Sequence, residues 1–317
     1  MFKDTLTYTR RKRAMELLSA VSRHLFLLGV SYVVLYPVLY MLSNAFKPVD
    51  QYWDPGVVWI PKSFTLETLY LVSLIINFGE EFLNTAIISL FPAVISTMTC
   101  MVYGYGLATY DFRGKKLVLL CLFLTIIIPQ EVIATSKYAI FAQFDVFGIL
   151  ELLHIPRPNL IGTAWVNILP AIFGMGLKNG LFIFIYMQFF SGFPKELHEA
   201  AALDGSGPFR TFSKIVVPTA RNINISVLLL SVVWNWNDYY TPAMFIRTRD
   251  TIAVALDKFK EHLDKITSMG VGLDELKAAN TQLQAACLVT IVPMVILYII
   301  LQRRFAEGIE NSGLTGM

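Results

Sequence analysis

The chain has 317 residues, of which 55% are hydrophobic and only 15% are charged, and its formal net charge is +3. Soluble domains usually carry about a quarter charged residues, so this composition predicts a membrane protein. The small net charge, without a basic cluster interleaved with aromatic residues, excludes nucleic acid as an expected partner.

Six segments are long and apolar enough to span a bilayer, which takes about 20 largely apolar residues. They are residues 25–46, 82–108, 117–136, 160–189, 221–245 and 280–302. Lys178 and Asn179 interrupt the fourth. Since the segments are too long for barrel strands, the sequence predicts an all-α polytopic membrane protein with about six transmembrane helices. No linker separates a soluble part, so residues 1–317 are expected to form one domain.

The first apolar segment follows the basic stretch TRRKR, an order that is also typical of a signal peptide. The apolar run extends to Met41 without a small-x-small cleavage site, so a retained helix is expected. Lys and Arg outnumber Asp and Glu on the side that holds the tails, 1–24 and 303–317, and the loop 190–220. These parts are therefore predicted to be cytoplasmic, and the protein to lie in the cytoplasmic (inner) membrane of the cell. On the outer side, we expect an ordered loop over 47–81 and a surface helix over 251–266.

The predicted cytoplasmic loop 190–220 contains a polar, alanine-rich block, KELHEAAALDGSGPFRTFSKIVVP. Good helix formers run to Leu203, and Gly205 is a helix stop signal. A second short helix is expected to place Phe209, Phe212, Ile215 and Val216 on one face and to end at Pro218. The block is either a generic amphipathic helix at the membrane surface or a rigid helix–turn–helix that fits a partner's groove.

This block resembles the EAA motif, the coupling loop of ABC importer permeases. The motif appears as Glu199-Ala200-Ala201, then Gly205, then Ile215-Val216-Val217-Pro218, with valine in place of leucine at Val217. The stretches FLNTAIISL, YGYGLATYDFRGKK, WNWNDYYTPAMF and RRFAEGIENSGLTGM also resemble carbohydrate-uptake permeases. Among these, the chain is similar to the shorter membrane subunit of maltose-type importers. The resemblance implies a type I ABC importer permease fold with a cytoplasmic coupling loop at 190–220.

The resemblance further implies a heterodimer with a second permease, an ABC ATPase dimer and an extracytoplasmic solute-binding protein. ATP and Mg are expected on the ATPase, and no cofactor is expected on this chain. The sequence contains neither a GxxxxGK[ST] loop nor a hydrolase constellation, so the chain is not expected to be an enzyme. Alternating access is the expected mechanism. The C-terminal GIENSGLTGM resembles the family tail that inserts between the ATPases, and a disordered end is the alternative. The expected ATPase-coupling residues are Glu199, Ala200, Ala201, Asp204, Gly205, Arg210, Lys214 and Pro218.

Polar residues within the predicted spans are the candidates for the substrate path, because each is costly in lipid. Asn235 and Asp238 share a helix face next to aromatic residues, which suits a sugar. The resemblance also aligns Gly174, Lys178 and Leu181 with sugar-contact positions. Two structural alternatives remain: Lys178 pairs with Asp238 or another carboxylate, and the aromatic residues form an interfacial belt. An unpaired Lys178 would instead favour an acidic substrate. The full candidate set is Gly174, Lys178, Asn179, Leu181, Asn235, Asn237, Asp238 and Tyr240.

Three functions follow from these observations. The first is the transmembrane subunit of an importer for a carbohydrate, expected to be an oligosaccharide and either neutral or acidic. The second is an ABC permease for glycerol phosphates or another small solute, and the third a membrane scaffold without transport activity. Cys100, Cys121 and Cys287 lie in apolar runs without CxxC spacing, so neither a disulfide nor a metal site is expected.

Overall fold

The computed structural model of the chain describes residues 2–193, 201, 203, 205–268 and 273–310. All regular structure within these residues is helical. The chain divides into two compact units, one made of residues 1–74 and 260–289 and the other of residues 75–259 and 290–317. The two units are described in turn.

The first unit begins with α1 (Phe2–Ala45), in which residues 2–24 of the predicted N-terminal tail are continuous helix. Residues Met15–Ala45 of this helix have a mean hydropathy of 2.1, and none of the most apolar stretch is buried inside the protein. An apolar helix without a protein covering is stable in hydrocarbon, where the backbone satisfies its own hydrogen bonds. The observed helix therefore confirms the first predicted span.

The loop that follows α1, predicted to lie on the outer side, is ordered, as expected. It consists of a 3-10 turn (Val49–Gln51), an irregular segment, and α2 (Glu67–Ile75). The Lys47 ammonium is buried and donates to the carbonyl oxygen of Val57 at 2.9 Å. Gln51 connects both sides of the loop, since its amide nitrogen donates to Ser63 Oγ at 2.8 Å and its amide oxygen accepts the Lys62 N–H at 2.9 Å. These bonds hold the segment without regular structure.

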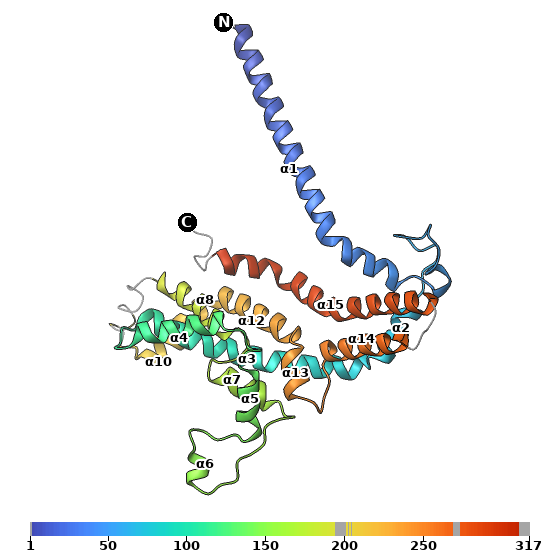
Figure 1. Cartoon of the computed structure of the whole chain (residues 1–317). Helices are drawn as coiled ribbons and strands as arrows, with labels where there is room; N and C mark the ends of the chain where they lie inside the picture. The colour runs from blue at the N-terminus through green and yellow to red at the C-terminus, as the bar shows by residue number, and fades with distance from the viewer. Residues whose placement is uncertain (1, 194–200, 202, 204, 269–272, 311–317) are drawn as a thin grey trace. The chain divides into compact units, whose positions relative to one another are not determined.

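The second unit is built on α3 (Phe78–Thr109), α8 (Asn179–Ser191) and α12 (Arg221–Trp236), which pack against one another (Figure 1). Phe182, Tyr186 and Ile223 are fully buried between them. The Tyr186 hydroxyl donates to Asn224 Oδ1 at 2.7 Å and so joins α8 to α12. A Cβ on Gly104 would lie only 2.4 Å from the Cβ of Tyr186, so α3 and α8 cross closely at a glycine.

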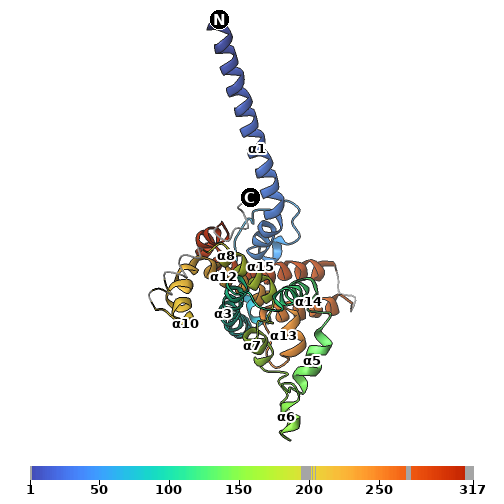
Figure 2. The same cartoon turned by 90° about the vertical axis from the view of Figure 1, so that its left-hand side faces the viewer.

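Shorter helices complete the second unit. These are α4 (Lys115–Ile127), α5 (Ala134–Ala142), α6 (Ile149–Leu152), α7 (Trp165–Ile172) and α13 (Tyr240–Phe245). Figures 1 and 2 both place α6 at the far end of this unit, beyond α5 and α7. The predicted surface helix over 251–266 is observed as α14 (Ile252–Ser268). Together with α15 (Leu273–Glu310), α14 passes from one unit to the other.

The loop that carries α6 is closed by Asp145. One carboxylate oxygen accepts the Leu150 N–H at 2.8 Å and the other accepts the Glu151 N–H at 3.1 Å. Arg157 Nε lies 3.3 Å from Asp145, and the same guanidinium also pairs with Glu151. The loop therefore has a polar centre that fixes its conformation.

Three of the predicted spans are long helices. Within the described part of the chain, three helices are long and apolar enough to cross a membrane: Met15–Ala45, Phe78–Thr109 and Ala278–Arg303. Counting the helix pair Pro208–Thr219 and Arg221–Trp236, which is bent by 76°, gives up to four.

The other predicted spans differ from the expectation because they are interrupted. Residues 117–136 break after Ile127, because Pro129 holds Ile128 in an extended conformation. Residues 160–189 break between α7 and α8, where Gly174 and Lys178 have φ angles of +70° and +59°. Residues 221–245 break at Asn237, between α12 and α13. Each interruption leaves polar backbone groups at the end of a short helix.

Candidate functional site

The first helix of the coupling loop ends at Gly205. This residue has a φ of +71°, and the Ser206 N–H donates to the carbonyl oxygen of Ala201 at 2.9 Å. A residue in the left-handed conformation, followed by an N–H that donates to the carbonyl oxygen five residues earlier, is characteristic of the Schellman helix terminus. The helix stop expected at Gly205 is therefore present, and Ala201 is buried. The predicted coupling residues Glu199, Ala200 and Asp204 lie outside the described residues.

The second helix of the coupling loop consists of α10 (Pro208–Thr211), a π-helical turn (Phe212–Val216) and α11 (Val217–Thr219), which contains Pro218. Val216 is fully buried, and Phe212 and Ile215 are half-buried, as expected. Phe209 was expected on the same face, but its side chain is 83% exposed. The π turn begins at Phe212 and changes the residue spacing, so the inward face does not extend back to Phe209. Arg210 and Lys214 are exposed.

Aromatic packing attaches the coupling loop to the helical core. The ring centroids of Phe212 and Tyr105 lie 5.2 Å apart, and those of Tyr105 and Phe190 lie 5.4 Å apart. Tyr105 belongs to α3 and Phe190 to α8. The chain then turns by 76° at the fully buried Ala220 and enters α12. The coupling loop is thus packed against the helices that form the core of this unit.

A small polar cavity of about 20 Å³ lies between the middle of α3 and the end of α12. It contains space for about one water molecule. α3 contributes Ser96, α5 contributes Lys137, α7 contributes Asn167, and α12 with the following turn contributes Asn235 and Asp238. The remaining lining residues are Pro92, Gln130, Val166, Pro170, Met175, Gly176, Leu177 and Thr241. The structure therefore brings together Asn235 and Asp238, the pair that the sequence singled out.

Hydrogen bonds orient the polar side chains of this cavity. The side-chain amide nitrogen of Asn235 donates to the Ser231 carbonyl oxygen at 2.8 Å, and the amide oxygen takes no part in this hydrogen bond. Asp238 accepts the Thr241 N–H at 3.1 Å, at the start of α13. Lys137 donates to Gln130 Oε1 at 3.2 Å, and its ammonium interacts electrostatically with the Asp238 carboxylate. The cavity lining thus contains one basic and one acidic side chain.

Sequence reasoning did not place Lys137, Asn167 or Ser96 in the site. Lys137 had a visible signal, because it is the one lysine between Leu117 and Ala142 and lies directly after a predicted span. Ser96 and Asn167 had none, because single small or amide residues are common in apolar helices. Only the packing of α3 against α7 brings these two residues to one place.

Lys178 is not among the residues that line the polar cavity, although Gly176 and Leu177 directly before it are. Its ammonium is 4.8 Å from the centroid of the Trp234 ring, within the range of a cation–π contact. Among the ion pairs of the described residues, none joins Lys178 to Asp238. The lysine beside Asp238 is instead Lys137.

The other candidate residues have different surroundings. Asn179 is fully buried, and its side-chain amide has no hydrogen-bond partner within the described part of the chain. A Cβ on Gly174 would lie 2.4 Å from the Tyr103 ring, so this glycine permits a close contact. Asn237 is exposed and donates to the Val233 carbonyl oxygen at 2.9 Å. Leu181 and Tyr240 are half-buried. None of these five residues lines the polar cavity among the residues that the structure describes.

Residues 100–311 match the sequence profile of a family described as the binding-protein-dependent transport system inner membrane component. The chain belongs to this family of ABC transporter permeases. The matched region includes the coupling loop, the polar cavity residues from α5 to α13, and α15. The most apolar stretch of α1, none of which is buried inside the protein, agrees with membrane embedding.

Several relatives of this permease have named substrates. It is 26% identical over 292 residues to the arabinooligosaccharides transport system permease protein AraQ of Halalkalibacterium halodurans, covering 90% of this chain and 93% of the relative. It is 26% identical over 302 residues to the maltodextrin transport system permease protein MalD of Streptococcus pneumoniae, covering 92% and 94%. It is also 23% identical over 303 residues to the sn-glycerol-3-phosphate transport system permease protein UgpE of Escherichia coli, covering 93% and 97%.

A solved structure confirms the expected fold class. The permease superposes with a TM-score of 0.67 on a chain from the crystal structure of a bacterial ABC transporter involved in the import of the acidic polysaccharide alginate. The match covers 91% of this chain and 96% of the other at 19% identity. At this identity the similarity concerns the fold alone, which is the type I ABC importer permease fold.

Proposed function

We propose that this permease is the transmembrane subunit of an ATP-driven importer that moves a carbohydrate across the membrane by alternating access. The observation that carries the proposal is that the same two helices, α3 and α12, contact both the coupling loop and the polar cavity. α3 carries Tyr105 against the coupling loop and Ser96 in the polar cavity, and α12 connects the bend at Ala220 to Asn235. A displacement of the coupling loop would therefore move the walls of the cavity.

The polar cavity suits a hydroxylated, uncharged substrate. Amide, hydroxyl and carboxylate groups offer both donors and acceptors, which a sugar hydroxyl can use in turn. Lys137 and Asp238 compensate each other, so a phosphate would gain little net attraction there. With a volume of about 20 Å³, the cavity is too small for a sugar ring. We infer that it is a closed section of the route, which widens when the helices move.

The names of the relatives agree with this choice. Those relatives include permeases for arabinooligosaccharides and maltodextrin, and also one for sn-glycerol 3-phosphate. The pairing of one basic with one acidic side chain in the cavity favours the first two classes over the third.

This function needs an assembly in which three other kinds of component join this permease. A second permease would complete the route, an ABC ATPase dimer would bind ATP and Mg, and a solute-binding protein would deliver the sugar from outside. The coupling loop, both termini and the ATPases would lie on the cytoplasmic side of the cell membrane. Exposed Arg210 and Lys214 flank the inward face of the coupling loop and are available for contacts with the ATPase.

Reconstitution of the complete transporter in proteoliposomes tests the function. ATP-dependent uptake would be measured with labelled arabino-oligosaccharide, maltodextrin, alginate oligosaccharide and glycerol 3-phosphate. We expect a neutral oligosaccharide to be taken up, and Asn235→Leu to reduce this uptake at least tenfold. Asn237→Leu is the matched control, because Asn237 is two residues away and outside the polar cavity. Uptake of glycerol 3-phosphate alone, or equal uptake by both variants, would reject the substrate class or the site.

A further inference from the structure

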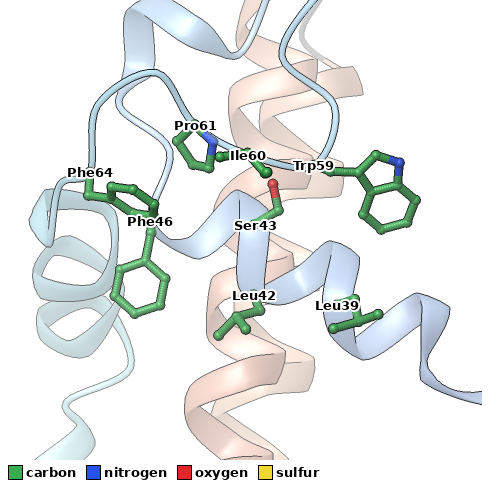
Figure 3. Close-up of a pocket in the computed structure, with 8 residues that line it drawn as sticks. All are labelled: Leu39, Leu42, Ser43, Phe46, Trp59, Ile60, Pro61 and Phe64. Carbon is green, nitrogen blue, oxygen red and sulfur yellow. The ribbon is translucent and has the colours of Figure 1, made fainter.

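A second hollow lies in the first unit and is chemically unlike the polar cavity. This apolar pocket has a volume of about 470 Å³ and is formed by two short stretches of chain. Leu39, Leu42 and Ser43 come from the last turns of α1 and Phe46 directly follows it, while Trp59, Ile60, Pro61 and Phe64 come from the loop after α1 (Figure 3). The volume falls in the range of small-molecule sites, so the pocket is large enough for part of an organic molecule.

The chemistry of the lining selects hydrocarbon. Ser43 and Trp59 are the only lining residues that carry a polar side-chain atom, and the Ser43 hydroxyl already donates to the Val58 carbonyl oxygen at 3.2 Å. A sugar or an ion would lose hydrogen bonds to water and find no replacements, at a cost of several kcal/mol for each buried polar group. An alkyl chain loses nothing of this kind and gains from leaving water.

The place of the pocket along α1 identifies the source of that hydrocarbon. Leu39 and Leu42 lie near the end of the apolar stretch Met15–Ala45, and both side chains are exposed. The pocket therefore continues the exposed apolar surface of this helix. Its other wall carries exposed apolar side chains that water would disfavour: Ile60 is 77% exposed and Phe64 is 72% exposed.

An aromatic cluster next to the pocket indicates its depth in the bilayer. The Trp59 ring lies 5.0 Å from that of Tyr36 in an edge-on arrangement, 6.3 Å from that of Tyr40 and 6.4 Å from that of Tyr32. Trp and Tyr gather at the boundary between headgroups and hydrocarbon. A pocket beside this cluster lies where the acyl chains of phospholipids begin.

We propose that the apolar pocket binds one acyl chain of a membrane phospholipid and holds the loop after α1 against the end of this helix. The bound chain covers Ile60 and Phe64, and the headgroup stays at the aromatic cluster. This site shares no lining residue with the polar cavity, and the proposal does not depend on sugar transport.

Photocrosslinking in membranes tests the occupant. The full-length permease would be made with p-benzoylphenylalanine in place of Ile60, irradiated in native membranes with its partner proteins, digested and analysed by mass spectrometry. Benzophenone forms a bond to a nearby C–H group, so an acyl chain in the pocket gives a peptide heavier by one phospholipid. A second permease with the probe in place of Leu27, exposed on α1 outside the pocket, reports ordinary contact with lipid.

Variants that fill the apolar pocket distinguish a specific lipid-binding site from ordinary contact with the bilayer. Ser43→Phe places a ring in the apolar pocket and should reduce the phospholipid adduct at position 60 at least fivefold, with no change at position 27. Leu39→Trp fills the same space from another turn of α1 and serves if Ser43→Phe does not accumulate in the membrane. An adduct to another protein, no adduct at position 60, or a phospholipid adduct insensitive to both fillings would each overturn the proposal.

Discussion

The rings of Phe212 and Tyr105 lie 5.2 Å apart and join the coupling loop to α3. An aromatic contact of this kind contributes about 0.5–1.5 kcal/mol beyond the area it buries. Since Ser96 lies on the same helix as Tyr105 and lines the polar cavity, the contact connects the predicted ATPase side to the proposed route.

Phe212→Ala is therefore expected to lower uptake more than it lowers ATP hydrolysis. The shortened side chain no longer fills the space beside Tyr105, so movement of the coupling loop is transmitted less completely. Uptake and phosphate release would be measured on the same proteoliposomes. Phe209→Ala is the control for stability, because this side chain is 83% exposed and its removal leaves no cavity. Parallel loss of both activities in Phe212→Ala would contradict a transmission role.

Gly205→Val is expected to abolish substrate-stimulated ATPase activity. A β-branched residue at a φ of +71° costs on the order of 1–2 kcal/mol, and the Schellman turn would open. Gly205→Asn is the matched variant, since asparagine tolerates the left-handed conformation, and it should keep most of the activity. If valine and asparagine behave alike, the backbone conformation at this position does not matter for coupling.

Gly104→Ala is expected to destabilise the second unit by about 1–3 kcal/mol, because the added Cβ would meet Tyr186 at 2.4 Å and the Met187 nitrogen at 2.9 Å. Gly106 lies two residues further along α3, and a Cβ there meets nothing within 4 Å. Gly106→Ala should therefore stabilise α3 by about 0.5–1 kcal/mol. Thermal unfolding of the purified permease in detergent measures both. Equal shifts in the two variants would show that the helices do not cross at Gly104.

Lys137→Met and Asp238→Asn should each impair uptake more than the double variant does. Each single change leaves one charge in the polar cavity without its counterpart, whereas the double variant restores neutrality. The coupling between the two sites follows from uptake rates in a double-mutant cycle. Additive effects would indicate that the two charges act independently.

The loop that carries α6 is expected to loosen in acid. Burial acts to raise the pKa of the Asp145 carboxyl, but the N–H groups of Leu150 and Glu151 and the Arg157 guanidinium outweigh it, so this pKa lies below the ordinary value of 3.8. A carboxyl whose pKa is lowered by folding stabilises the loop fully above its ordinary pKa and loses that contribution as pH falls through the lower, folded value. Hydrogen exchange of the peptide covering residues 143–158, corrected for intrinsic rates, should show this loss in acid. Asp145→Asn should show faster exchange already at pH 7 and little further change.

The sequence allowed the class of fold and the coupling loop to be predicted because both depend on local signals. Apolar length marks α1, α3 and α15, and Gly205 has the residue type that a left-handed helix end requires. The interruptions of the other spans were only partly foreseen. Pro129 limits one of them by its own geometry, whereas the left-handed conformation of Lys178 is uncommon for a lysine and depends on packing around it.

The candidate site was predicted less completely, because its members come from four separate segments. Asn235 and Asp238 were found through their spacing on one helix face. Lys137 and Asn167 join them only because α5 and α7 fold against the end of α12, and no pattern in either segment announces that contact. A single lysine at the end of a predicted span is a useful signal of a functional site, but it does not show which residues will lie beside it.

The bend at Ala220 has a mechanical consequence. The arm Pro208–Thr219 and α12 meet there at 76°, and hydrogen bonds to both sides of Ala220 hold the corner. At a rise of 1.5 Å per residue, the arm is about 18 Å long and α12 about 24 Å. Rotation about this corner would turn a shift of about 3 Å at the tip of the arm into about 4 Å near Asn235, a lever ratio of about 1.3. That stroke exceeds the width of a water molecule, so a push from a bound ATPase that slides the arm sideways would be enough to open a gap one molecule wide at the opposite end of the helix.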